Sequence, residues 1–308
     1  MRLLMAGALA TVTAAGLATI RPAVVTDEER SAARVIRGDR MRADIRFLSS
    51  DLLEERAPGS RGDRLAREYL SSRMEAIGLE PGARGGSWEQ SLDAGGQGNE
   101  GRRRRGANVV GRLVGRDVER RREAVVYSAH FSRGLDGAAG PAALLAVAEA
   151  FVALPGRPRR SVLFAVVADE EQGLPGAALL ARTPPAPVVR FVAHLDLDGA
   201  GLGERPREEP VAGQGRSSFD GWIRTLAEAQ ERSVARDAFL DEGACRASSR
   251  VGFARAGVPT ACLGAGTDVE DLQLAFFLGA KVAEAPIAPV WHPVDGLEPA
   301  FLAADGRR

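Results

Sequence analysis

The sequence predicts an α/β fold, a three-layer sandwich in which helices cover both faces of a mostly parallel central sheet. From about residue 107 onward, short runs rich in β-forming residues alternate with helical segments, which is typical of parallel strands joined by helices. One of these runs, residues 161–168, is almost wholly apolar, as expected of a strand buried on both faces. The chain has 308 residues, 45% of them hydrophobic, which is enough for one large domain or two modest ones.

The first predicted segment is a signal peptide over residues 1–23. Arg2 is followed by an uncharged stretch, residues 3–20, that is rich in Ala, Gly and Thr. A basic start, a weakly apolar run and small residues suited to cleavage are typical of an export signal. We therefore expect an exported protein, periplasmic or extracellular, without stable membrane insertion. The alternative is an N-terminal membrane tether, although this composition makes a poor spanning helix.

Residues 28–106 are predicted to be N-terminal helices and a Gly/Arg-rich loop, within the same domain as the core at 107–308. Apolar side chains recur at helical spacing within 28–81, interrupted by a Pro- and Gly-containing break at 57–62. Residues 82–106 are Gly-rich and polar and end in four consecutive arginines before Gly106, a pattern typical of a solvated loop.

The core elements follow in alternation. A helix is predicted from Pro141, because proline is tolerated in the first turn of a helix. The predicted strands are 108–113, 124–128, 161–168, 189–197 and 258–263, and the predicted helices between them are 141–154, about 175–182 and 218–231.

Charge and motif content exclude several classes of function. The chain has 41 basic and 41 acidic residues, so it lacks the basic excess typical of a nucleic-acid-binding protein. No Gly-rich phosphate loop follows a predicted strand, which leaves nucleotide binding unsupported. Cys245 and Cys262 are the two cysteines, and either one disulfide or two free thiols is compatible with the sequence.

Acidic residues and histidines gather where the predicted strands end. In open α/β sheets, ligands bind beyond the carboxyl ends of the strands, and the residues there include His130, Asp136, Glu170, Glu171 and Asp198, with His292 near the end of the chain. Imidazole and carboxylate ligands suit zinc, and a two-metal site needs a bridging carboxylate. Within the Glu170–Glu171 pair, one side chain could coordinate a metal while the other takes a proton.

Two other interpretations of these residues stay open at this point. Carboxylates at strand ends commonly cap helices or lie in solvated loops. His194 shares a strand face with Asp196 and Asp198, which makes it a weaker candidate ligand.

Several motifs occur in an order shared with a known family. They span residues 47–62, 108–111, 128–131, 135–140, 168–176, 197–199, 253–259 and 291–293. In this combination they resemble the M28 zinc peptidases, the aminopeptidase Y-like family, over about residues 45–300. The resemblance implies a zinc-aminopeptidase-like (phosphorylase/hydrolase-like) fold.

The resemblance also implies roles for individual residues. Asp136 would bridge two zinc ions per chain, His130 and Asp198 would complete one site, and Glu171 and His292 the other. Glu170 would be the general base. The implied protein is a metallopeptidase acting on peptide or protein substrates, with trimming of amino ends expected over trimming of carboxyl ends.

The sequence departs from the family pattern beside these residues. The family usually has Asp two positions after the first ligand and His next, and here these positions are Ser132 and Arg133. A family Ser-Asp-His motif is replaced by Ser248 followed by Ser249 and Arg250. The alternatives are therefore a catalytically inactive M28-fold homologue that binds peptide, and a zinc acyltransferase such as a glutaminyl cyclase, which shares the fold.

Overall fold

The computed structural model of the protein describes residues 25–54, 56–92, 106–131, 136–168, 175–185, 187–197, 211–214, 217–218, 220–231, 234–236, 250–262 and 268–290. The predicted signal peptide at 1–23 and the arginine run at 102–105 lie outside these residues. Within the described stretches, no helix is both long and apolar enough to cross a membrane.

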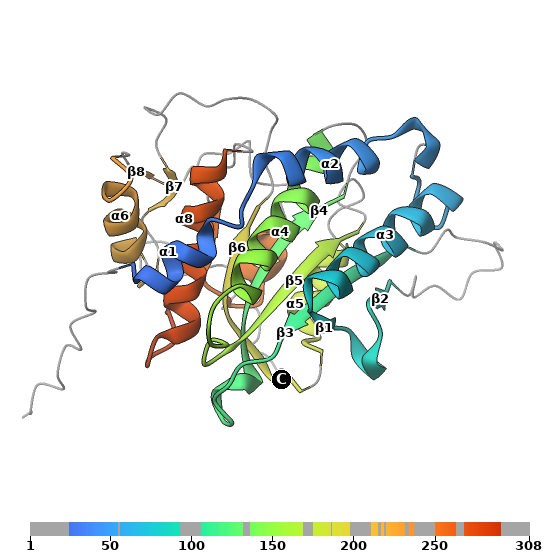
Figure 1. Cartoon of the computed structure of the whole chain (residues 1–308). Coiled ribbons are helices and arrows are strands. Elements are labelled where there is room, and N and C mark those ends of the chain that lie inside the picture. The colour runs from blue at the N-terminus through green and yellow to red at the C-terminus, as the bar shows by residue number, and fades with distance from the viewer. Residues whose placement is uncertain are drawn as a thin grey trace, which may run out of the picture.

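A seven-stranded mixed sheet forms the centre of the protein (Figure 1). Its strands follow the order β1-β3-β5-β4-β6-β9, and β2 also pairs with β3. The strands are β1 (Glu80–Pro81), β2 (Glu89–Ser91), β3 (Ala107–Leu113), β4 (Glu123–His130), β5 (Ser161–Val167), β6 (Arg190–Asp196) and β9 (Thr260–Cys262). The four strands β5, β4, β6 and β9 are parallel, whereas β3 runs antiparallel to β5, so the prediction of a mostly parallel sheet is confirmed.

Alternate residues of the central strands belong to two separate hydrophobic clusters. In β4, Val125, Tyr127 and Ala129 belong to the larger cluster, while Ala124 and Val126 belong to the smaller one. Successive side chains of a strand point to opposite faces, so the two clusters are the cores on the two faces of the sheet. The protein is therefore a three-layer α/β sandwich, as predicted.

Helices from both halves of the chain cover the first face (Figure 1). They are α1 (Asp27–Ala33), α2 (Gly38–Leu48), α3 (Arg61–Ile77), α4 (Asp136–Val152), α6 (Asp220–Glu228) and α8 (Val269–Glu284). On the second face, the smaller cluster contains residues of α5 (Pro175–Arg182) and α7 (Arg250–Arg255). Because α1, α2 and α3 pack into the same cluster as α4 and α8, the N-terminal helices share a core with the rest of the chain.

The predicted helical region at 28–81 is divided into three α-helices and a short 3-10 turn, η1 (Asp51–Leu53). The Ser60 hydroxyl caps α3 by accepting a hydrogen bond from the Asp63 amide, and Gly78 ends this helix in the left-handed conformation with φ 100°. The predicted break at 57–62 and the predicted end at Gly78 are confirmed, although α3 begins within the break, at Arg61.

The beginning predicted for the next helix was wrong. Helix α4 begins at Asp136, so Pro141 lies in its second turn and not at its opening. Proline cannot donate the backbone hydrogen bond expected at that position, which would reach the carbonyl of Gly137. The favourable packing of the apolar residues 138–151, most of which are fully buried, outweighs the loss of one hydrogen bond.

Several elements escaped the sequence-based prediction. The region 82–106, predicted as loop, contains β2 and a turn η2 (Arg84–Gly86), and α8 was not predicted. A second sheet consists of β7 (Val211–Gln214) and β8 (Val234–Arg236). A further turn, η3 (Arg120–Arg122), leads into β4.

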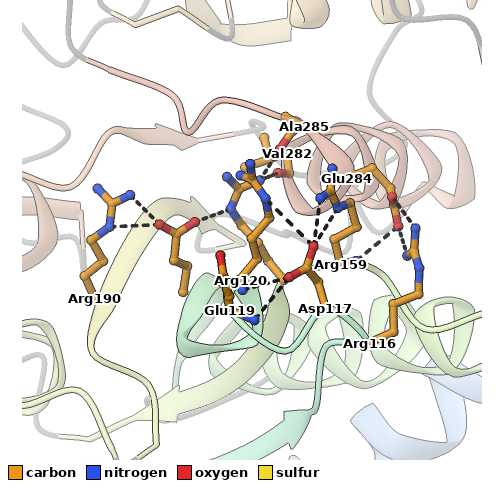
Figure 2. A network of polar contacts seen from close by, with 11 residues as sticks. Arg116, Asp117, Glu119, Arg120, Arg159, Arg190, Val282, Glu284 and Ala285 are labelled. Atoms are coloured by element: carbon orange, nitrogen blue, oxygen red, sulfur yellow. Dashed lines mark hydrogen bonds and ion pairs between the residues drawn. The ribbon is translucent and has the colours of Figure 1, made fainter.

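A network of ion pairs lies at the amino ends of the parallel strands (Figure 2). The Arg160 guanidinium donates to the carbonyl oxygens of Val282, at 3.0 Å, and Ala285, at 2.5 Å, and so fastens the end of α8 to the sheet. Asp117 accepts hydrogen bonds from Arg159, with the shortest at 2.7 Å, and from the amides of Glu119 and Arg120. These contacts connect the end of α8 and the turn before β4 to the amino ends of the parallel strands, which we call the foot of the sheet. The foot lies opposite the edge formed by the carboxyl ends of these strands.

Candidate active site

The carboxyl ends of the parallel strands meet at one edge of the sheet. His130, the last residue of β4, pairs with Val167, the last residue of β5. Two residues earlier, Ser128 pairs with Asp196 at the end of β6. The Leu197 amide extends the alignment by donating to the Ser128 carbonyl at 2.9 Å. The segments that follow these three strands therefore all start from the same edge, as the sequence predicts.

The first turns of α4 lie against this edge. A Cβ on Gly140 would lie 3.1 Å from the Ala129 Cβ, 3.6 Å from the Leu197 carbonyl oxygen and 3.8 Å from that of His130. Glycine thus allows the helix to approach the ends of β4 and β6 closely. Asp136 begins the helix four residues earlier, one turn closer to its N-terminus.

The described residues include two of the six predicted site residues. His130 is half-buried at the end of β4, and Asp136 is the first residue of α4. Glu170, Glu171, Asp198 and His292 lie outside the described residues, as do Ser132, Arg133 and Ser249, whereas Arg250 is the first residue of α7. Among the residues that are described, no group of three or more His, Cys, Asp or Glu side chains could hold a metal. The proposed ligand set remains a prediction.

His194, the weaker candidate ligand, is fully buried within the sheet. Its Nε2 lies 2.8 Å from the Ser128 hydroxyl and its Nδ1 lies 2.7 Å from the Thr260 hydroxyl. Its ring stacks on Phe253 with 3.9 Å between the centroids. Because both ring nitrogens face hydroxyl groups, His194 is a structural residue that links β4, β6 and β9 and is not a metal ligand.

Two residues near this edge were not singled out from the sequence. The Arg56 guanidinium lies 4.3 Å from the ring centroid of Phe131, the residue after His130, and also donates to the Leu48 carbonyl. Burial lowers the pKa of Arg56, which nevertheless remains protonated at neutral pH. The second residue is Asn108, the first residue of the 108–111 motif, whose polar side chain is fully buried.

The sequence match decides the family. Residues 108–296 match the model of Peptidase family M28. The chain belongs to Peptidase family M28. No curated protein matches the sequence.

Solved structures share the fold of this M28 chain at low sequence identity. Legionella pneumophila LapA aminopeptidase is 14% identical with a TM-score of 0.61, over 85% of this chain and 76% of LapA. A Zn-dependent exopeptidase from Parabacteroides distasonis is 13% identical with a TM-score of 0.56, over 85% of this chain and all of the other. Bacteroides thetaiotaomicron glutaminyl cyclase is 13% identical with a TM-score of 0.55, over 82% of this chain and 99% of the cyclase. At these identities the likeness shows the fold, which peptidases and a cyclase share.

Proposed function

We propose that this M28 protein is an exported, zinc-dependent aminopeptidase that releases residues from the amino ends of peptides. The observation that carries the proposal is the family match over residues 108–296, since all six predicted site residues fall within it. The common edge at which β4, β5 and β6 end supports the proposal, because the segments containing five of those residues start there.

The residues at this edge fit zinc chemically. Imidazole and carboxylate groups are the nitrogen and oxygen donors that zinc prefers in catalytic sites. His130 is half-buried at the end of β4. In the proposed site, Asp136 would bridge two ions, His130 and Asp198 would hold one of them, and Glu171 and His292 would hold the other. When bound, the ions would polarise the scissile carbonyl and lower the pKa of a water molecule.

Glu170 is the proposed general base. Its carboxylate takes a proton from the attacking water and then delivers that proton to the leaving amine as the peptide bond breaks. This assignment gives the two adjacent glutamates different tasks, because Glu171 holds metal while Glu170 moves the proton. Attack on the peptide at its amino end would release one residue per cycle.

Export is proposed from residues 1–23 alone. A charged residue at position 2 precedes an uncharged run of about the length typical of a signal peptide. Expression of the full chain, followed by fractionation and N-terminal sequencing, tests this proposal. We expect the chain outside the cytoplasm with its first residues removed, whereas an intact cytoplasmic chain would contradict export.

The metal content of the purified protein tests the catalytic proposal. We expect about two zinc ions per chain in the wild type, as a bridged two-metal site requires. The Glu171→Ala variant should hold less zinc, while Glu75→Ala, which changes an exposed residue of α3, should match the wild type. Absence of zinc from the wild type after zinc supplementation would reject the catalytic proposal and leave the inactive peptide-binding homologue.

A cyclase is the second candidate, because a glutaminyl cyclase shares the fold. The two activities differ in their products. An aminopeptidase releases a free amino acid from a peptide, whereas a cyclase releases ammonia from an amino-terminal glutamine. Assaying both products on one glutaminyl peptide distinguishes the two, and we expect the free amino acid.

A further inference from the structure

Asn108 is a fully buried polar residue in β3 that contacts two distant parts of the chain. Its Oδ1 accepts a hydrogen bond from the Ala168 amide at 3.0 Å, and its Nδ2 donates to the Gly176 carbonyl at 2.9 Å. Nδ2 also donates to Gln90 Oε1 at 2.8 Å. Only one orientation of the amide satisfies all three contacts, because the acceptor faces an N–H and the donor faces two oxygens.

The two partners of Asn108 flank the segment that contains the paired glutamates. Ala168 follows β5 and Gly176 lies in the first turn of α5, so Glu170 and Glu171 lie between them in the chain. The two flanks also contact each other. A Cβ on Gly176 would lie 2.5 Å from the carbonyl oxygen of Ala168 and 2.8 Å from its nitrogen. The two ends of the segment 168–176 therefore lie next to each other, and the Asn108 amide is hydrogen-bonded to both of them.

The same network also fixes the far end of α5. Gln90 Nε2 donates to the Thr183 hydroxyl at 3.2 Å, just after the last residue of the helix. Strands β2 and β3 are therefore hydrogen-bonded to α5 at both of its ends. Asn108 of β3 bonds the N-terminal end, and Gln90 of β2 bonds Thr183 just beyond the C-terminal end. The contact at the finish does not include Ala168, which makes Thr183 a suitable control position.

We propose that Asn108 is a positioning residue for the paired glutamates. By bonding Ala168 and Gly176 at once, it fixes both ends of the segment that carries the proposed base and a proposed zinc ligand. An amide is suited to this role because it offers a donor and an acceptor about 2 Å apart on one rigid group. The inference rests on the proposed function, since it concerns how that site is held.

Two variants disrupt the contact from opposite sides. Asn108→Asp keeps the shape and the acceptor for the Ala168 amide but loses the donor to Gly176 and places a carboxylate against its carbonyl. Gly176→Ala leaves the Asn108 residue itself unchanged, but the added methyl would overlap both the Asn108 Oδ1 and the Ala168 backbone, so the three groups must move apart. Thr183→Val is the matched control, since it removes only the hydrogen bonds at the finish of α5.

Zinc affinity, measured by competition with a chelator, is the first measurement. We expect both Asn108→Asp and Gly176→Ala to weaken zinc binding at least about tenfold, as losing support for metal ligands commonly does. Thr183→Val should leave zinc affinity unchanged even where it lowers the melting temperature of the metal-free protein. Equal losses of zinc affinity in the control and the two variants, or wild-type affinity in Asn108→Asp, would overturn the inference.

Hydrogen–deuterium exchange of the metal-free protein provides a measurement that needs no zinc. We expect peptides covering residues 168–176 to exchange faster in both variants than in the wild type or in Thr183→Val. Unchanged exchange in these peptides would overturn the inference. If the wild type binds no zinc while the variants still exchange faster, Asn108 fixes the segment but the proposed function is wrong.

Discussion

Arg160 and Glu123 form an ion pair at the foot of the sheet, with Nε and Oε2 2.7 Å apart and the Arg160 side chain only 1% exposed. The other Glu123 oxygen accepts hydrogen bonds from Arg190, whose side chain is 58% exposed. One carboxylate therefore forms ion pairs with both a buried and an exposed arginine. The two pairs share chemistry and differ in burial, so they should differ in their contribution to stability.

Removing the shared carboxylate tests this difference. In Glu123→Gln, Arg160 stays buried without a countercharge, and we expect the free energy of unfolding to fall by about 3 kcal/mol. In Arg190→Ala, only an exposed pair is lost, and the expected decrease is less than about 1 kcal/mol. Urea denaturation of both variants measures these values. Equal losses would show that burial of Arg160 does not matter.

Acid should destabilise the protein partly through Asp117. Hydrogen bonding from Arg159 lowers the pKa of Asp117 from its usual 3.8 to about 2. The unfolded chain takes up this proton at higher pH than the folded protein does, so the carboxylate contributes stability above about pH 4 that is lost as the pH falls toward 2. We expect Asp117→Asn to flatten the decline in unfolding free energy between pH 4 and 2, and Glu75→Gln to leave it as steep as in the wild type.

Gly279 on α8 allows close contact with Tyr127 of β4. A Cβ at this position would overlap the Tyr127 phenol, which is fully buried and donates to the Ala275 carbonyl at 2.7 Å. We expect Gly279→Ala to cost about 3 kcal/mol of unfolding free energy through overpacking and displacement of α8. Gly221→Ala in α6 is the control, because apart from its chain neighbours and the nearby backbone of its own helix, no atom lies within 4 Å of its added methyl. That variant should be neutral or slightly stabilised, since alanine favours the helix.

Elements with a strong local signal were predictable from the sequence. Strand β5 is apolar apart from Ser161 and α5 has clear limits, so both were predicted nearly to their residue bounds. Strand β2 is three polar residues, Glu89–Ser91, and it exists because β3 pairs with it. Such pairing is long-range and leaves no periodic signal in the strand itself. The beginning of α4 was missed because Pro141 resembles a first-turn proline. The helix instead begins at Asp136, because the residues on both sides of Pro141 are buried in helical conformation.

The candidate site was predictable in outline for a different reason. The carboxyl ends of the strands in a parallel sheet meet at one edge whatever the lengths of the loops. The position of His130 at this edge was therefore predictable from its place at the end of a strand, and it pairs there with Val167. The role of Asn108 could not be predicted, because its partners lie 60 and 68 residues away along the chain. His194 shows the converse. Its residue type suggested a ligand, and its two hydroxyl partners assign it to the structure of the sheet.

The division of tasks between the paired glutamates gives the last prediction. Glu170→Gln keeps the size of the side chain but cannot accept a proton, so we expect kcat for peptide hydrolysis to fall about 100- to 10,000-fold while zinc content stays at the wild-type level. Asp169→Asn alters the neighbouring carboxylate, which has no proposed role, and should retain zinc and most of the activity. Steady-state kinetics on an aminoacyl substrate, with metal analysis of the same samples, measures both quantities. Loss of zinc in Glu170→Gln would make Glu170 a ligand, and full activity in that variant would exclude it as the base.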